Sequence, residues 1–142
     1  MSVPAFSRLL RLSPNFMLAE FVSPNDPDGW AYVQANWSRF GPRLFRLANN
    51  VLQPARAKFG HVLHVTSGVR SPSFNRSIGG AKASRHMEAD AADCWADRVP
   101  LDDLHAFLAT LPDVGGLAMR AGAFVHVDCR ARVGGQIVRW TY

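Results

Sequence analysis

Residues 115–142 read GGLAMRAGAFVHVDCRARVGGQIVRWTY. Three short runs lie within this stretch, at residues 117–119, 123–129 and 136–142, and glycines separate them. Short apolar runs bounded by glycine are typical of strands that are joined by tight turns. The C-terminal part of the chain is therefore predicted to form strands of a β-sheet.

The preceding residues carry helical and strand patterns in turn. From Pro42 to Gly60, apolar residues recur on one helical face, and Pro54 is expected to kink this helix or to begin a second segment. Residues 62–67 are a β-branched run that predicts a strand. Residues 69–83 are polar and irregular, and we expect a loop there.

Two further segments lie between this loop and the C-terminal strands. Residues 89–95 are either strand or helix by propensity, and Pro100 opens a second helix that reaches Leu111. Helices early in the chain and hairpin-like strands late in it indicate an α+β domain with an antiparallel sheet.

The length of 142 residues predicts one domain. Its first part is rich in turn-forming residues, and we expect residues 1–41 to form an N-terminal arm that wraps the core. Residues 42–142 are then expected to form the core itself.

Composition excludes several classes of protein. Hydrophobic residues make up 48% of the chain and charged residues 19%, which is too apolar for a disordered chain. No apolar run approaches the roughly 20 residues of a membrane-spanning helix, and the N-terminus lacks the pattern of a secretory signal. We therefore expect no membrane partner and synthesis in the cytoplasm.

The net charge is +5, and arginine supplies all the positive charges except Lys58 and Lys82. A basic surface suits nucleic acid, anionic lipid or the acidic polymers of a bacterial envelope, or it merely keeps a small domain soluble. No zinc-finger, RNA-recognition or helix-turn-helix pattern is present, so nucleic acid is not an expected partner.

Side chains that can bind a metal concentrate in two places, residues 84–93 and 124–128. His86, Asp93 and His126 supply three ligands of the kind that a catalytic zinc site uses, with a fourth position open to water. Ordinary polar surface is the alternative interpretation of the same residues.

Alternation along the last predicted strand suggests a general base. Asp128 lies two residues after His126, so both side chains point to the same face, and Asp128 is the candidate base. The alternative is that Asp128 only orients a ligand or binds Arg130. Glu88 is the next candidate base. Cys94 and Cys129 follow the two aspartates, so both thiols are expected to face the core.

Two polar residues are candidates for substrate binding. Arg70 ends a predicted strand at a turn, and its guanidinium can hold a carboxylate or a developing oxyanion, although a structural salt bridge is the alternative. Ser84 lies two residues before His86, where it either hydrogen-bonds substrate or holds the loop in place.

The surrounding motifs resemble the zinc D-Ala-D-Ala peptidases, in particular their small carboxypeptidase-like branch in bacteria and phages. The matching motifs are SGVRSP (67–72), Asn75, GGA (79–81), Ser84-x-His86, Asp93 and FVHVD (124–128). The resemblance implies the fold of the hedgehog signalling domain, a central antiparallel sheet flanked by helices. It also implies that His86, Asp93 and His126 bind Zn²⁺, and that Arg70 binds the substrate or the transition state, with a catalytic role. Ser84 and Asn75 are further candidates for substrate binding.

Two positions depart from the family pattern. Ala89 stands where glycine is usual, and Ala123 stands where many members carry a catalytic acid, three residues before the last histidine. The first departure puts the local backbone in question, and the second removes the usual general base.

The expected function is zinc-dependent hydrolysis of a peptide bond in peptidoglycan stem peptides, of either carboxypeptidase or endopeptidase type. The alternative is a non-catalytic, zinc-containing component of a phage or phage-like tail. Because the wall lies outside the cytoplasm, we expect delivery by a phage lysis system or by a tail.

Overall fold

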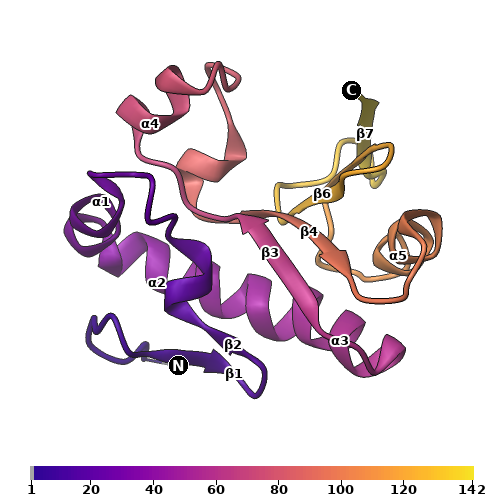
Figure 1. Ribbon diagram of the computed structural model, residues 1–142, viewed down its shortest axis with the longest axis horizontal. Coiled ribbons are helices and arrows are strands. Elements are labelled where there is room, and N and C mark those ends of the chain that lie inside the picture. The colour runs from indigo at the N-terminus through magenta and orange to yellow at the C-terminus, as the bar shows by residue number, and fades with distance from the viewer. Residues whose placement is uncertain (1) are drawn as a thin grey trace.

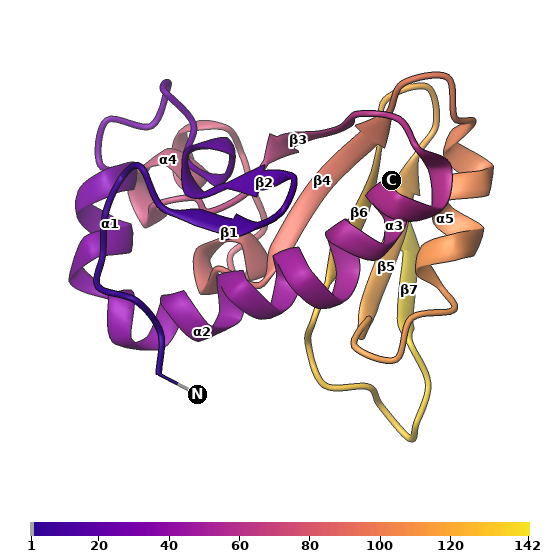
Figure 2. The same cartoon turned by 90° about the horizontal axis from the view of Figure 1, so that it is seen from below.

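The computed structural model of the protein describes residues 2–142, so only Met1 of the expected arm lies outside the described residues. Its main sheet has five strands in the order β3-β4-β6-β5-β7. Figure 1 labels β3, β4, β6 and β7, and Figure 2 also labels β5. These strands are β3 (Leu63–Ser67), β4 (Ala91–Ala96), β5 (Gly116–Arg120), β6 (Phe124–Asp128) and β7 (Val138–Thr141).

Neighbouring strands of this sheet are antiparallel except at one edge. β3 pairs with β4, β4 with β6 and β6 with β5 in antiparallel fashion, whereas β7 is parallel to β5. Residues 129–137 carry the chain past β5, so β7 lies beyond β5 and runs in the same direction. The predicted α+β class and central antiparallel sheet are confirmed, with β7 as a parallel edge strand that does not follow a tight turn.

Helices cover the sheet and the N-terminal segment. The α-helices are α1 (Gly29–Ala35), α2 (Trp37–Leu47), α3 (Gln53–Phe59), α4 (Pro72–Ser77) and α5 (Leu101–Leu108). Two 3-10 helices, η1 (Leu18–Phe21) and η3 (Arg85–Glu88), and a π-helix, η2 (Ala48–Leu52), complete the set. No helix between residues 2 and 142 is long and apolar enough to cross a membrane.

The predicted helix from Pro42 to Gly60 is one continuous run made of α2, η2 and α3 (Figure 2). The π-helical turn ends directly before α3, which has Pro54 in its first turn, so a new segment begins there as expected. Gly60 ends the run with a φ of 70°, a left-handed conformation that favours glycine. The start was predicted wrongly, because α2 begins at Trp37 and its buried face already includes Phe40.

A second difference lies in the segment predicted as a loop. Residues 72–77 form α4, with Pro72 at the first helical position and the Ser71 hydroxyl accepting a hydrogen bond from the backbone N–H of Phe74. These are start signals of a helix, but the helix is so short that no apolar periodicity marks it.

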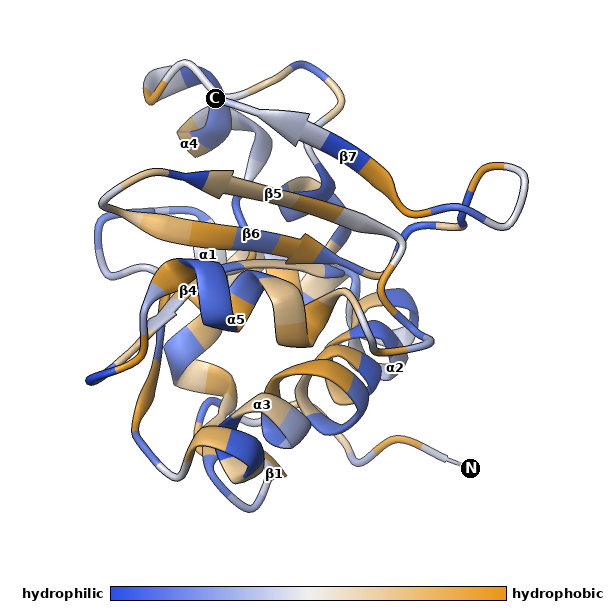
Figure 3. Cartoon of the chain, turned by 90° about the vertical axis from the view of Figure 1, so that its right-hand side faces the viewer, coloured by the Kyte–Doolittle hydropathy of each residue, from blue (hydrophilic) through white to orange (hydrophobic). Residues whose placement is uncertain are grey.

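The two faces of the main sheet have different roles. Cys94, Val125 and Leu117 are fully buried, and α5 packs against β4, β5 and β6. In Figure 3, α5 has apolar segments beside polar ones, and its buried residues are Leu104 and Leu108. Successive side chains of a strand alternate between faces, so Asp93 and His126 lie on the face away from Cys94 and Val125.

The N-terminal segment adds to the core. Residues Arg11–Ser13 (β1) and Phe16–Met17 (β2) form a two-stranded sheet, and Phe16, Leu18 and Phe21 are almost completely buried. Residues 41 and 42 both lie within α2, so this helix joins the segment to the rest of the chain without a linker.

Candidate metal centre

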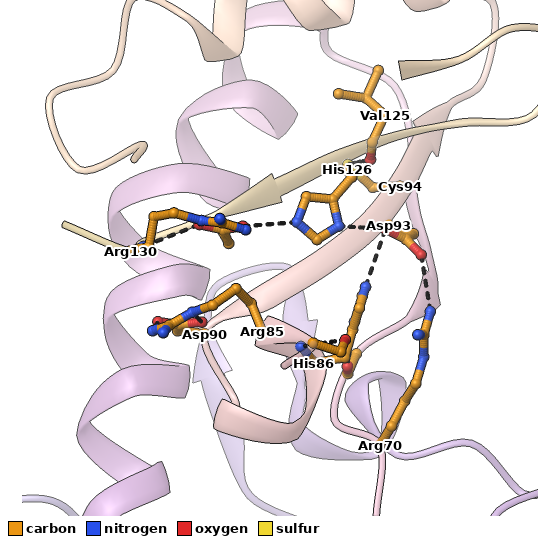
Figure 4. Close-up of polar contacts among 12 residues, drawn as sticks. Arg70, Arg85, His86, Asp90, Asp93, Cys94, Val125, His126 and Arg130 are labelled. Carbon is orange, nitrogen blue, oxygen red and sulfur yellow. Dashed lines mark hydrogen bonds and ion pairs between the residues drawn. The ribbon is translucent and has the colours of Figure 1, made fainter. Parts of the chain in front are cut away.

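Three side chains converge on the polar face of the sheet: His86 from η3, Asp93 from β4 and His126 from β6 (Figure 4). Asp93 and His126 are directly paired across β4 and β6. One ligand atom from each of the three residues lies within 4.8 Å of the others, and all three residues are buried. The predicted ligand set is therefore assembled by two neighbouring strands and one short helix.

A backbone carbonyl orients His86. Its Nδ1 lies 2.7 Å from the carbonyl oxygen of Gly68. A carbonyl only accepts hydrogen bonds, so Nδ1 donates to it and Nε2 is the nitrogen that is directed to the cluster. Nε2 faces Oδ1 of Asp93 at 3.3 Å.

A carboxylate orients His126 in the same way. Its Nε2 lies 2.8 Å from Oδ2 of Asp128, and its Nδ1 lies 2.9 Å from Oδ1 of Asp93. Both ring nitrogens of His126 therefore face carboxylates. In the metal-free protein, burial lowers the pKa of His126, but the hydrogen bonds to Asp128 and Asp93 outweigh it and raise the pKa. Because Asp128 holds Nε2, Nδ1 is the nitrogen that would be offered to a metal ion.

Asp93 is held from both sides. Its Oδ1 faces the two histidines, while its Oδ2 accepts a hydrogen bond of 3.3 Å from Nη2 of Arg70. Burial raises the pKa of Asp93, but the hydrogen bonds from His126 and His86 outweigh it and hold the pKa below its usual range. The carboxyl group is therefore ionised, as a metal ligand must be.

The donor set fits a zinc ion. Two imidazole nitrogens and one carboxylate oxygen, each oriented by a further hydrogen bond, are the protein ligands of a typical catalytic zinc site. A cleft of about 590 Å³ opens onto His86, Asp93 and His126, which leaves room for water and substrate on the remaining side.

Arg70 lies at the edge of this centre and lines the cleft. Its Nε donates to the hydroxyl of Ser67 at 2.9 Å, and its Nη1 donates to Oδ1 of Asn75 at 3.3 Å. Burial lowers the pKa of the Arg70 guanidinium, and Asp93 opposes the shift. The ion pair between Arg70 and Asp93 matches the structural salt bridge that was the alternative to substrate binding. Arg70 also faces the open side of the centre, so both interpretations apply to it.

Asn75 does not line the cleft, contrary to the expectation that it binds substrate. It is 2% exposed, and its Nδ2 donates to the carbonyl of Ala81 while its Oδ1 accepts from Arg70. A Cβ on Gly80 would lie 2.0 Å from Oδ1 of Asn75, so only glycine fits there. Asn75 positions Arg70 and the loop of residues 79–81.

Asp128 is fully buried and has no contact with the open side of the centre. Besides His126, it binds Arg130, whose Nε donates to Oδ1 at 2.8 Å and whose Nη2 donates to Oδ2 at 2.7 Å. Burial raises the pKa of Asp128, but the hydrogen bonds from His126 and Arg130 hold it below its usual range. These contacts match the alternative interpretation, in which Asp128 orients a ligand and binds Arg130.

A family model described as Peptidase M15 matches residues 27–128, which are 102 of the 142 residues. The chain belongs to the peptidase M15 family. The matched region contains all three metal-ligand candidates and Arg70. A search of curated protein sequences finds no significant match. The resemblance to zinc D-Ala-D-Ala peptidases is thereby confirmed at the level of the family, and this membership supports a metallopeptidase.

The backbone conformation at Ala89 explains why the M15 pattern has a glycine at this position. Ala89, which stands where the family has glycine, has a φ of 58° and lies directly after η3. Its side chain is completely buried. The family glycine is thus explained by a left-handed backbone conformation, which alanine adopts here at some cost.

The second departure leaves the cleft of this M15 protein without the usual acid. Ala123 lies in the turn between β5 and β6 and is exposed. Glu88, the second candidate base, pairs with Arg43 at 3.0 Å and does not line the cleft. Of the carboxylates between residues 2 and 142, only Asp93 lines it.

Ser84 lines the cleft, and its hydroxyl also accepts a hydrogen bond of 3.2 Å from the backbone N–H of His86 at the start of η3. It therefore holds the loop in place and is also accessible to substrate. Both cysteines are buried in the core, as predicted, and burial raises the pKa of both thiols.

Several residues of the cleft were not predicted from the sequence. They are Arg85, Arg120, Arg130, Trp140 and Tyr142. Trp140, Arg120 and Tyr142 follow from alternation once the register is known. Ala118 pairs with both His126 and Trp140, so these side chains share one face of the sheet. Arg120 and Tyr142 lie two residues beyond this row, on the same strands or at their ends. The register itself, and the parallel pairing of β7 above all, carries no signal in the sequence.

Proposed function

We propose that this protein is a zinc-dependent peptidase that cleaves a peptide bond in peptidoglycan stem peptides. The observation that carries the proposal is the convergence of Nε2 of His86, Oδ1 of Asp93 and Nδ1 of His126 at a cleft of an M15 family member. A zinc ion held by these three residues would polarise a carbonyl group and lower the pKa of water from 15.7 to about 7.

The chain's own residues would prepare this centre for chemistry. Gly68 and Asp128 hold one nitrogen of His86 and of His126, so the other nitrogen of each ring would present a lone pair to the metal when it is unprotonated. Arg70 is fixed by Ser67, Asn75 and Asp93, so its guanidinium can stabilise negative charge that develops on the substrate without reorganising. In this proposal Asp128 is a positioning residue, which replaces its assignment as general base.

Substrate is expected to enter between two walls of the cleft. One wall is the loop of residues 79–84, and the other is formed by Phe124, Trp140 and Tyr142. Four arginines line the cleft, and three of them are paired with aspartates, Arg70 with Asp93, Arg85 with Asp90 and Arg130 with Asp128. Arg120 leaves one positive charge unpaired, which suits the anionic peptides of a bacterial wall.

The test is digestion of purified peptidoglycan by the zinc-loaded protein, with mass spectrometry of the soluble fragments. The proposal expects new amine and carboxyl ends at one bond of the stem peptide, and no release by an Asp93→Asn variant. Release of intact disaccharides without peptide cleavage would overturn it.

A second candidate function is a non-catalytic, zinc-containing component of a phage or phage-like tail that binds the wall. The absence of a cleft carboxylate other than Asp93, in the part of the chain that the structure describes, favours this candidate. Full zinc loading and binding to peptidoglycan without any cleavage would support it over the peptidase.

We also propose that another machine brings the protein to the wall, either a phage lysis system or a tail. Expression of the chain in a bacterial cytoplasm tests this proposal. Wall damage only after membrane permeabilisation is the expected result, and wall damage in intact cells would contradict it.

A further inference from the structure

Arg120 lies on the same face of the sheet as the metal centre. Ala118 pairs with His126, and Arg120 pairs with Phe124. Since alternate residues of a strand share a face, Ala118 and Arg120 belong to the face that carries His126. Arg120 also lines the cleft, at the end of β5 and next to the turn that leads into β6.

The charges around the cleft are paired, with one exception. Arg85 forms an ion pair with Asp90, Arg130 with Asp128 and Arg70 with Asp93. Arg120 has no carboxylate within ion-pair distance and no side-chain hydrogen bond among residues 2–142. It is thus the cleft guanidinium whose donors are all free for a ligand.

The surroundings of Arg120 leave its guanidinium open to an anion. Phe124 and Tyr142 make an edge-to-face contact, with ring centroids 5.5 Å apart, and both rings line the cleft with Arg120. Arg120 itself is exposed, so these rings form the wall of the cleft beside the guanidinium and leave it open to a ligand. Among the side-chain carboxylates of residues 2–142, only Asp93 lines the cleft, and it already contacts Arg70.

We propose that Arg120 is a specificity-determining residue that binds a carboxylate group of the substrate, on the β5–β7 side of the metal centre. The planar guanidinium can hold a carboxylate through two parallel hydrogen bonds. This inference rests on the proposed peptidase function. The carboxylate is either the C-terminus of the peptide or an acidic side chain within it, and the experiment separates these two sources.

The experiment compares two pairs of synthetic peptides with the zinc-loaded protein. The first pair is an N-acetylated peptide that ends in D-Ala-D-Ala and its C-terminal amide. The second pair has a blocked C-terminus and carries either a glutamate or a glutamine. Binding is measured by calorimetry and cleavage by chromatography, for the wild type, Arg120→Gln and Arg120→Lys. Arg139→Gln is the matched control, because Arg139 is exposed on β7 between Val138 and Trp140 and hence on the opposite face.

The inference expects one acid to bind more tightly than its amide, by about 2- to 5-fold, which is typical of an ion pair with an exposed guanidinium. Arg120→Gln should abolish that preference, Arg120→Lys should keep part of it, and Arg139→Gln should keep all of it. Which pair shows the preference identifies the source of the carboxylate.

Equal binding of acid and amide in both pairs, a preference that survives Arg120→Gln, or no binding of any peptide would overturn the inference. Calorimetry separates this failure from a failure of the proposed function. If the acid binds through Arg120 but no peptide and no peptidoglycan is cleaved, the peptidase proposal fails and the carboxylate site stands.

Discussion

Nε2 of His126 lies 2.8 Å from Oδ2 of Asp128, two residues further along the same strand. This contact fixes the protonated nitrogen of His126, so that Nδ1 faces Asp93 at 2.9 Å. Arg130 in turn holds both oxygens of Asp128. Residues 126–130, which read HVDCR, begin in β6 and end two residues after it. This segment therefore contains the candidate metal ligand His126, the carboxylate of Asp128 that orients it, and the guanidinium of Arg130 that orients the carboxylate.

The first prediction concerns this carboxylate. Asp128→Asn should weaken zinc binding by about 10- to 100-fold, the usual effect of losing a group that orients a metal ligand. Excess zinc should then restore most of the activity. Zinc affinity is measured by competition with a chelating dye, and kcat is measured at saturating zinc.

A general base would behave differently. Loss of a base lowers turnover by about 10²- to 10⁴-fold even when the metal is bound. Unchanged zinc affinity with such a loss of kcat at saturating zinc would contradict the positioning role of Asp128. Because Asp128 is fully buried, thermal unfolding of the variant must accompany the measurement.

The second prediction concerns the three ligands. His86→Ala, Asp93→Ala and His126→Ala should each lose most of the bound zinc, because each removes one of three protein donors. Metal content after gel filtration is the measurement. His61→Ala is the matched control, since His61 precedes β3 and does not belong to the cluster. Stoichiometric zinc in all three variants would refute the site.

The ligand set could be predicted from the sequence because residue type and motif order carry it. His86, Asp93 and His126 lie in the short motifs that the M15 resemblance rests on, and the structure brings all three together. The helices from 37 to 59 and from 101 to 108 were largely predictable as well, since one face of each is apolar.

The roles of the neighbouring polar residues could not be predicted in this way. Alternation placed Asp128 on the correct face, but only the distance to Nε2 of His126 shows which nitrogen it contacts. Asn75 lies in a polar segment, yet its side chain is turned inward to Arg70 and Ala81. Arg120 entered the site only through the register of β5 against β6.

The third prediction concerns Ala89 and its positive φ of 58°. Ala89→Gly removes the conformational strain but loses a buried methyl group, so its free energy of unfolding should stay within about 1 kcal/mol of the wild type. Ala89→Val should lose at least about 2 kcal/mol, because a β-branched residue resists this conformation and the site is fully buried.

Urea unfolding measures both variants of Ala89. Ala83→Val is the control, because Ala83 is exposed and has no positive φ. Equal stability of Ala89→Val and Ala89→Gly would show that backbone conformation does not explain the glycine of the family pattern.

The fourth prediction concerns acid stability of the metal-free protein. The pKa values of Asp93 and Asp128 are held below their usual range by hydrogen bonds from His126, His86 and Arg130, against the opposite effect of burial. A carboxyl group with a lowered pKa in the folded state stabilises the fold above its unfolded pKa of about 4, and this contribution is lost as the pH falls further.

The free energy of unfolding in the presence of a chelator should therefore begin to fall near about pH 5 and keep falling below about pH 3, toward the lowered pKa values of the folded state. The fall should be smaller in Asp128→Asn, which lacks one of the two groups. An equally steep fall in the variant would show that Asp128 does not contribute to the acid sensitivity.

The central claim is that the cluster of His86, Asp93 and His126 binds one zinc ion and that this ion is required for peptide cleavage. Titration of the metal-free protein with zinc, with peptidoglycan peptide cleavage recorded at each addition, tests it most directly. We predict no cleavage without zinc and a linear rise that ends at about one equivalent. Full cleavage before any zinc is added, or none when one equivalent is bound, would contradict the claim.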